Sequence, residues 1–274
     1  MVKEIKIQDP FARLKKVITS PPLYLRPEPI DEISSKWSRI GDFDKNLALE
    51  QYENFVDTLK SEGVKVKILE PSPVKWNQTF VRDVGFSLKN GVIIGRMKEH
   101  GRMGEEDLLM KFLKLIDIPV IHRVERGFLE GGDILFINEK VFIGHGNRTD
   151  HEGIREIKDF LGDLEIDTIH LKKEFVHLDL AMNVVDDSTI LMFPNAFHAE
   201  IKISDWNTIL ASEKEYLTIP ANVLLLREGK VIASEENHLT NKLLEKEGID
   251  VVRVEINEIL KAGGGPRCLT FPIY

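Results

Sequence analysis

The feature that most constrains the fold of this chain is a repeated unit of helix, turn and strand. Helical patterns are followed, after a charged or glycine-bearing turn, by short runs rich in β-branched residues. The four clearest copies are Leu47 to Lys60 with Gly63 to Leu69, Glu105 to Leu115 with Ile118 to Ile121, His151 to Leu161 with Ile166 to Leu171, and Asn241 to Glu247 with Ile249 to Val254. A weaker pattern over Ile203 to Ser212 predicts a fifth helix.

Between these copies, pairs of apolar runs around a short polar turn predict β-hairpins. The predicted turns are Lys89 to Gly91, Asn138 to Lys140, Asp186 to Ser188 and Glu228 to Lys230. The N-terminal run Leu14 to Ile18 and the C-terminal run Cys268 to Tyr274 are expected to pair and supply a fifth hairpin. The chain therefore predicts five α/β units, with its two ends meeting inside one of them.

Polar or reactive residues stand at the same place in each unit, where the first strand of the hairpin begins. They are Asp83, Asp133, Asp179, Asn222 and Cys268, separated by 50, 46, 43 and 46 positions. If five units close around a pseudo-fivefold axis, equivalent positions converge at the centre. The repeat therefore predicts one central site built from these residues.

Composition limits the class of ligand. The formal net charge of -8 argues against nucleic acid, which is bound through a basic face, and is compatible with a cationic small molecule. One cysteine excludes an intramolecular disulfide, the first ten residues lack the apolar stretch of a signal peptide, and no apolar run is long enough to span a bilayer. We expect a cytoplasmic protein with no membrane or nucleic-acid partner.

Cys268 is the candidate nucleophile. A lone cysteine is more often an apolar filler of the core, but Gly263 to Gly265 precede it and let the backbone approach a ligand closely. Arg267 adds positive charge beside the thiol, which favours the thiolate.

His177 and Glu130 are the candidate proton carrier and its partner. His177 stands two residues before Asp179 at the start of a predicted strand, so both side chains project from the same face. The ordinary pKa of a histidine imidazole lies near neutrality, so this residue can both donate and accept protons. Glu130 begins the run Glu-Gly-Gly-Asp, whose glycines favour close approach, and a carboxylate there can orient the imidazole.

Asp83 and Asp179 are the remaining acidic residues that we place at the centre. Two carboxylates suit a planar, delocalised cation, because a carboxylate and a guanidinium form two parallel hydrogen bonds. His177, Asp179, Glu130 and Cys268 are all conceivable metal ligands, yet the chain contains no CxxC, HExxH or similar local spacing. We therefore predict neither a metal nor a cofactor.

Five motifs in this order resemble those of the guanidino-group modifying enzymes: arginine deiminase, dimethylarginine dimethylaminohydrolase and the amidinotransferases. They are Asn77 to Asp83, Glu130 to Asp133, Gly144 to Thr149, His177 to Asp179 and Gly263 to Cys268. The resemblance runs from about Asn77 to the C-terminus. It implies the pentein fold, a five-bladed α/β propeller, with residues 1–274 as a single catalytic domain.

The resemblance also implies roles for individual residues. Cys268 becomes the nucleophile, His177 the general acid and base, Glu130 its acidic partner, and Asp83 and Asp179 the clamp on the guanidinium. Asn77 and Arg148 fall where arginine deiminases hold the substrate carboxylate, and Arg267 is assigned to substrate binding with them. Two features depart from arginine deiminases: the chain lacks their extra helical domain, and Arg267 is not their usual residue before the cysteine. Residues 20–42 match no motif and are interpreted as a lid loop.

The predicted function is hydrolysis at the guanidinium carbon of arginine or a related guanidine through a covalent intermediate on Cys268. Three alternatives stay open: an amidinotransferase, an arginine dihydrolase, and a non-enzymatic ribosome-associated factor of the same fold. Cys268, His177 and Glu130 together disfavour the third. The identity of the guanidine and the oligomeric state, a homo-oligomer included, are not determined by the sequence.

Overall fold

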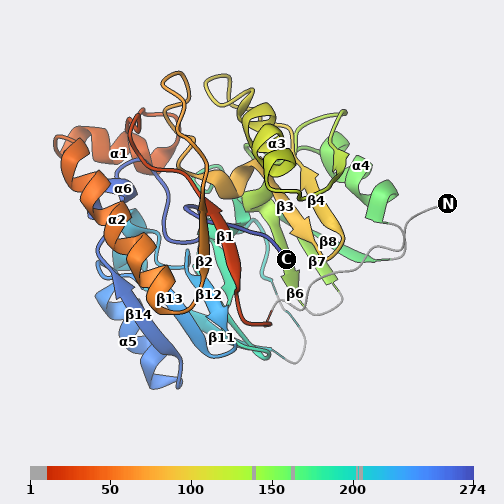
Figure 1. The fold of residues 1–274 in the computed structure, drawn as a ribbon. Helices are drawn as coiled ribbons and strands as arrows, with labels where there is room; N and C mark the ends of the chain where they lie inside the picture. The colour runs from red at the N-terminus through yellow and green to blue at the C-terminus, as the bar shows by residue number, and fades with distance from the viewer. Residues whose placement is uncertain (1–10, 138–139, 162–163, 202, 204–205) are drawn as a thin grey trace.

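Five sheets of three strands each, arranged around a common centre, form the framework (Figure 1). The computed structural model describes residues 11–137, 140–161, 164–201, 203 and 206–274. Within every sheet the middle strand pairs antiparallel with one neighbour and parallel with the other. The predicted fivefold repeat of hairpins is confirmed.

The middle strands of the sheets are β1 (Lys16–Thr19), β4 (Gly91–Ile94), β7 (Lys140–His145), β10 (Thr189–Met192) and β13 (Lys230–Ser234). Their antiparallel partners are β15 (Phe271–Pro272), β3 (Gly85–Leu88), β6 (Ile134–Ile137), β9 (Met182–Val184) and β12 (Leu224–Arg227). Their parallel partners are β2 (Lys65–Ile68), β5 (Val120–Arg123), β8 (Glu165–His170), β11 (Asn207–Leu210) and β14 (Asp250–Val254).

The chain ends complete one sheet, as predicted. In the antiparallel pair β1–β15, Val17 lies opposite Pro272 and Ile18 opposite Phe271. Ile18 and Phe271 are fully buried, so the closure is sealed by apolar side chains. The pairing places Cys268, three residues before β15, at the centre of the ring of sheets.

Helices cover the outside of the sheets (Figure 1). They are α1 (Glu32–Ile40), α2 (Lys45–Ser61), α3 (Glu105–Leu115), α4 (His151–Leu161), α5 (His238–Lys246) and α6 (Asn257–Leu260). Local chemistry defines where they begin: the Asp44 carboxylate accepts from the backbone N–H groups of Asn46 and Leu47 at the start of α2. None of the helices in the described ranges is both long and apolar enough to cross a membrane.

The helix predicted over Ile203 to Ser212 is wrong in the part that the structure describes. Asn207 to Leu210 form β11, parallel to β10. Burial alternates there as a strand requires, because Ile209 is buried while Thr208 and Leu210 are exposed. Of the predicted hairpin turns, Asn138 and Glu139 lie outside the described residues.

Residues 20–42 contain α1, which packs on the 3-10 helix η4 (Glu213–Thr218). Trp37 Nε1 donates to the Leu217 carbonyl oxygen at 2.9 Å, and Lys36 Nζ lies 4.5 Å from the centre of the Tyr216 ring. Asp31, which caps α1, lies against Gly263. The segment therefore borders the glycine run that leads to Cys268, and its role as a lid stays a prediction.

Candidate active site

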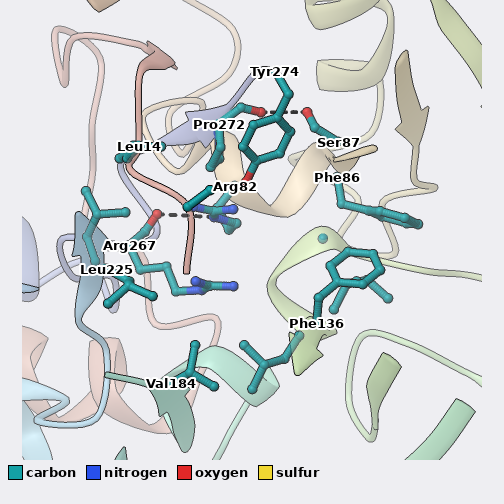
Figure 2. Close-up of a pocket in the computed structure, with 15 residues that line it drawn as sticks. Leu14, Arg82, Phe86, Ser87, Phe136, Val184, Leu225, Arg267, Pro272 and Tyr274 are labelled. Atoms are coloured by element: carbon teal, nitrogen blue, oxygen red, sulfur yellow. Dashed lines mark hydrogen bonds between the residues drawn. The ribbon is translucent and has the colours of Figure 1, made fainter. Parts of the chain in front are cut away.

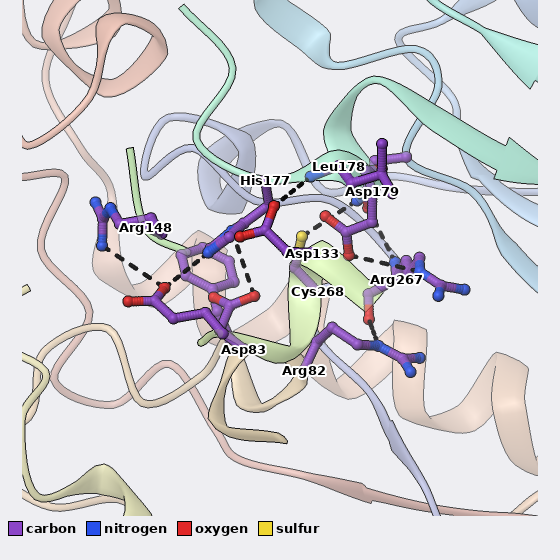
Figure 3. A network of polar contacts seen from close by, with 12 residues as sticks. Arg82, Asp83, Asp133, Arg148, His177, Leu178, Asp179, Arg267 and Cys268 are labelled. Carbon is purple, nitrogen blue, oxygen red and sulfur yellow. Dashed lines mark hydrogen bonds and ion pairs between the residues drawn. The ribbon is translucent and has the colours of Figure 1, made fainter. Parts of the chain in front are cut away.

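The polar residues that begin the repeated hairpins meet at the centre of the molecule (Figure 3). Asp83 and Asp179 lie in the short 3-10 turns η1 (Val81–Val84) and η3 (Leu178–Leu180), and η2 (Gly131–Asp133) packs against both. Asp83 Oδ1 is 3.5 Å from His177 Nδ1, and Asn222 Nδ2 is 3.2 Å from Cys268 Sγ. The five residues named here, Asp83, His177, Asp179, Asn222 and Cys268, are at most 4% exposed. The convergence expected from the repeat is therefore present.

His177 and Glu130 form a buried ion pair. Nε2 of His177 lies 2.7 Å from Oε2 of Glu130, and the backbone N–H of Lys98 donates to the other carboxylate oxygen at 2.9 Å. Burial disfavours charge on both groups, but the hydrogen bond with His177 and its charge lower the pKa of Glu130 to about 2. Burial opposes charge on His177 too, yet the charge of Asp83 and the hydrogen bond to Glu130 raise its pKa to about 10. At neutral pH the imidazole is protonated and can donate a proton.

Arg102 is a site residue that the sequence reasoning missed. Its Nη1 donates to Asp83 Oδ2 at 2.5 Å, and its Nη2 donates to Glu105 Oε2 at 2.9 Å. Burial opposes its charge, but Glu105 and Asp83 raise the pKa of Arg102 well above its ordinary value. Arg102 thus offsets one of the central negative charges and holds Asp83 in place. It lies in an irregular turn outside the repeated motifs, so no pattern pointed to it.

Asp179 and Asp83 present buried carboxylate oxygens that lack hydrogen-bond partners among the described residues. These atoms are both carboxylate oxygens of Asp179 and Oδ1 of Asp83. Burial, and then the like charge of Asp83, raise the pKa of Asp179 to about 6, against the lowering effect of Arg267. Buried polar atoms are costly when unpaired. A planar cation rich in N–H groups matches three such acceptors.

The thiol of Cys268 is buried, and its surroundings favour the protonated form. Burial, and then the charges of Asp179 and Asp83, raise its pKa well above the ordinary value, against hydrogen bonds from Gly265 and Asn222. A cation placed between the two carboxylates would offset their charges and so favour ionisation of the thiol.

The glycines before Cys268 serve close packing against protein side chains. A Cβ at Gly264 would clash with the ring of Phe80, and one at Gly265 would lie 2.7 Å from Asn222 Oδ1. Gly132 is similar, because a Cβ there would lie 2.8 Å from both Asp83 Oδ1 and His177 Cγ. We expected close approach to a ligand; the neighbours found here are the side chains that build the site.

Asn222 connects the thiol to its surroundings. Its Nδ2 donates to Cys268 Sγ at 3.2 Å and to the Asp179 carbonyl oxygen at 3.0 Å, while its Oδ1 accepts from the backbone N–H of Arg267 at 3.1 Å. The sequence placed Asn222 among the matched positions without giving it a role. These contacts fix the turn that carries the thiol.

Replacing Asn222 with Ala should shift the alkylation of Cys268 to higher pH, because the variant loses a donor that stabilises the thiolate. A hydrogen bond to a charged group contributes about 1.5 to 3 kcal/mol, so we expect a shift of roughly one unit. The pH dependence of the rate of reaction with iodoacetamide measures this shift, and no other thiol contributes because the chain has one cysteine. Asn241→Ala is the control: Asn241 is equally buried but bonds the Ser234 carbonyl oxygen. An unchanged profile in Asn222→Ala would contradict this role.

Asp133 binds neighbouring units together. Its Oδ2 accepts from the Thr149 hydroxyl at 2.5 Å and its Oδ1 from the backbone N–H of Leu178 at 2.9 Å. Burial raises its pKa to about 7. This matched position therefore anchors η3, which carries Asp179.

The remaining predicted site residues lie in two places. Asn77 is buried with its Oδ1 unpaired among the described residues, and Arg148 lies 3.9 Å from carboxylate oxygens of both Glu99 and Glu130. Arg148 is thus on the Glu130 side of the site (Figure 3). Arg267 Nε lies 3.5 Å from Asp179 Oδ2, but its guanidinium lines a different cavity (Figure 2). Within the described ranges, no group of three His, Cys, Asp or Glu residues is arranged to hold a metal ion.

Comparison with known proteins shows that this chain is similar to enzymes that act on guanidino groups. The family described as N,N dimethylarginine dimethylhydrolase, eukaryotic, matches residues 22–274. An uncharacterised protein of Bacillus subtilis, YkgA, is 27% identical over 96% of this chain and 93% of its own. The arginine deiminase of Borreliella afzelii is 28% identical over 83% of this chain and 68% of its own.

A solved structure confirms the pentein fold. The N-terminal domain of ArgZ, an arginine dihydrolase from cyanobacteria solved with its product, superposes with a TM-score of 0.84. The match covers 94% of this chain and 97% of that domain at 23% identity.

Proposed function

The chain belongs to the N,N-dimethylarginine dimethylhydrolase family of guanidino-group modifying enzymes. On that premise we propose that it hydrolyses a carbon–nitrogen bond at the guanidinium carbon of arginine or a closely related guanidine. Cys268 is the nucleophile, His177 the general acid and base, and Glu130 its partner. Asp83 and Asp179 clamp the guanidinium. Residues 1–274 act as one catalytic domain that needs no cofactor.

The observation that carries this proposal is the set of buried acceptors beside the thiol. Three carboxylate oxygens of Asp83 and Asp179 are buried without hydrogen-bond partners among the residues that the structure describes. A guanidinium offers five N–H or more in one plane, which pairs such oxygens and cancels their charge. The same cation reduces the effect of both carboxylates on Cys268, whose pKa they raise. Binding of substrate and formation of the nucleophile are therefore coupled.

The first chemical step forms the bond between Cys268 Sγ and the guanidinium carbon. The thiol proton is released to solvent as the substrate binds, and the thiolate attacks. The bond from carbon to one terminal nitrogen then breaks, and that nitrogen takes the proton of His177 and leaves as ammonia or an amine. The high pKa of His177, about 10, keeps this proton on the imidazole until attack has begun.

The second step returns the enzyme to its starting state. The neutral His177 takes a proton from water as the water oxygen attacks the same carbon. The carbon–sulfur bond then breaks, and the remaining hydroxyl proton passes to the departing sulfur, which restores the thiol. Glu130 stabilises the imidazolium that results. With arginine the products are citrulline and ammonia.

The far end of the substrate is the place where arginine and other guanidines differ. Arg148 is buried, and its ion pairs with the described carboxylates of Glu99 and Glu130 are 3.9 Å long, so its guanidinium is placed to donate hydrogen bonds to a substrate carboxylate. Asn77, with an unpaired amide oxygen, can accept from the substrate amine. We therefore propose a free α-amino acid as the substrate class.

The Arg148→Ala variant should lose roughly ten- to a hundredfold in kcat/KM for arginine, because a charge-assisted pair of about 1.5 to 3 kcal/mol disappears. Agmatine, which has the guanidinium but no carboxylate, is the matched substrate and should lose little. Steady-state kinetics with both compounds measures the difference. Equal losses for both, or none for either, would show that Arg148 does not meet a carboxylate.

Product analysis separates the remaining chemical outcomes. Mass spectrometry after mixing the enzyme with arginine, methylated arginines and agmatine should detect the ureido product and ammonia or an amine. Ornithine with two equivalents of ammonia would indicate an arginine dihydrolase, and transfer to an added amine an amidinotransferase. No product from any guanidine would overturn the proposed function.

Residues 20–42 retain their proposed role as a lid. Asp31 lies against Gly263, and the charge of Arg148 acts on its carboxylate, so the segment reaches both the thiol turn and the carboxylate end. Proteolysis within residues 20–42 should slow when a substrate analogue is bound. Cleavage at the same rate with and without the analogue would remove the lid.

A further inference from the structure

A second cavity lies beyond Asp179, away from the thiol, and is lined by two arginines (Figure 2). We call it the two-arginine cavity, after Arg82 and Arg267, and its volume is about 80 Å³. Figure 3 shows Asp179 between the Cys268 thiol and Arg267. No residue to which we assign a bond-making, proton-transfer or clamping role lines this cavity.

The two guanidinium groups make few hydrogen bonds with the described residues. Arg82 is 7% exposed, and its hydrogen bonds go to two neutral oxygens, the Arg267 carbonyl at 3.4 Å and the Thr270 hydroxyl at 3.3 Å. The Nε of Arg267 has no hydrogen-bond partner in the described ranges and lies 3.5 Å from Asp179. Burial, and then the charge of Arg267, lower the pKa of Arg82 to about 9. The charges of Asp179 and then Tyr274 act against this lowering. Two guanidinium groups therefore face one small cavity.

The rest of the wall is mostly apolar. Phe136, Val184 and Leu225 line the cavity with the arginines, with Leu225 beside Arg267 and Phe136 on the opposite side (Figure 2). The Ser87 hydroxyl already donates to the Pro272 carbonyl oxygen. An inorganic oxyanion would satisfy the arginines but leave these walls unmatched, whereas a carboxylate with a short hydrocarbon tail matches both.

We propose that the two-arginine cavity binds a small aliphatic carboxylate. The carboxylate oxygens accept from the guanidinium groups of Arg82 and Arg267, and the hydrocarbon tail packs on Val184, Leu225 and Phe136. The ligand is an anion and binds behind Asp179, so this site is separate from the one that takes the guanidinium.

Isovalerate and its neutral isostere isovaleramide test the proposal on the unmodified protein. At a concentration about 100 times its Kd, isovalerate should raise the unfolding temperature by roughly 5 °C, because it binds only the folded state. Isovaleramide should give no shift. Stabilisation by phosphate but not by isovalerate would overturn the ligand class, and no shift with any of them would overturn the site. Neither measurement depends on turnover, so the result stands apart from the proposed function.

Variants of cavity residues test whether the shift in unfolding temperature arises from binding in the two-arginine cavity. Arg82→Gln should abolish the shift and the saturation-transfer NMR signal of isovalerate, while Arg227→Gln, an exposed arginine at the end of β12, should keep both. If Arg82→Gln does not fold, Leu225→Phe fills the apolar side and leaves both arginines in place; it should also abolish binding. Isovalerate binding that survives in Leu225→Phe, or in a folded Arg82→Gln, would contradict the assignment.

Discussion

The Cys268→Ala variant should lose turnover by a factor of at least about 10⁴, because no other described group can form the covalent intermediate at the guanidinium carbon. Its fold should remain. The side chain is small and its hydrogen bond with Asn222 links a neutral amide to a thiol, so the loss of stability should be on the order of 1 kcal/mol, or about 2–4 °C in unfolding temperature. Activity and thermal unfolding should therefore separate.

Steady-state rates and differential scanning fluorimetry on the same preparation measure both quantities. Cys268→Ser is the matched control for shape, since it keeps a hydroxyl in the place of the thiol and should be equally inactive. Substantial turnover by folded Cys268→Ala would remove the nucleophile from the account.

In the His177→Asn variant, the adduct on Cys268 should form slowly and accumulate, because its breakdown needs a group that takes a proton from water. Removing a general acid and base costs about 10² to 10⁴ in rate. The imidazolium also contributes positive charge beside the thiol, so the first step should slow as well. Intact-protein mass spectrometry after mixing with arginine should show an enzyme that carries the substrate minus ammonia.

His122→Asn is the matched control, because it makes the same substitution at a histidine that also pairs with a glutamate. His122 Nε2 also lies 2.7 Å from a glutamate, Glu156, but in strand β5 and helix α4 rather than among the central residues, and the His122 side chain is partly exposed. It should turn over arginine at the normal rate without an adduct. Normal turnover in His177→Asn would show that another group carries the proton.

Much of the architecture could be predicted from the sequence because the repeat has a strong local signature. The hairpin turns at Asn90 and Gly229 and the helices from Glu105 and His151 follow from turn residues and apolar periodicity within a few positions. The pairing of β1 with β15 follows from the count of units, since four complete hairpins leave two unpaired ends. Where the periodic signal was weak, over Ile203 to Ser212, the prediction failed.

The site was predictable only where its residues occupy matched positions. Asp83, Asp179 and Cys268 were expected at the first positions of the repeated strands; they lie in the turns just before those strands, and the fivefold closure brings them together. Arg102 could not be found in this way, because it reaches Asp83 from an irregular turn and its role depends on tertiary contact. Arg267 was assigned to substrate binding; its guanidinium lines the two-arginine cavity and its Nε lies 3.5 Å from Asp179 Oδ2, so that role stays a prediction.

A chemical quench of the unmodified enzyme during turnover of arginine labelled with ¹³C at the guanidinium carbon would trap the covalent intermediate. Peptide mapping should find the labelled carbon on the peptide that contains Cys268, and the label should later appear in the ureido product. Formation of labelled product with no label on that peptide at any time point would contradict attack by Cys268 on the guanidinium carbon.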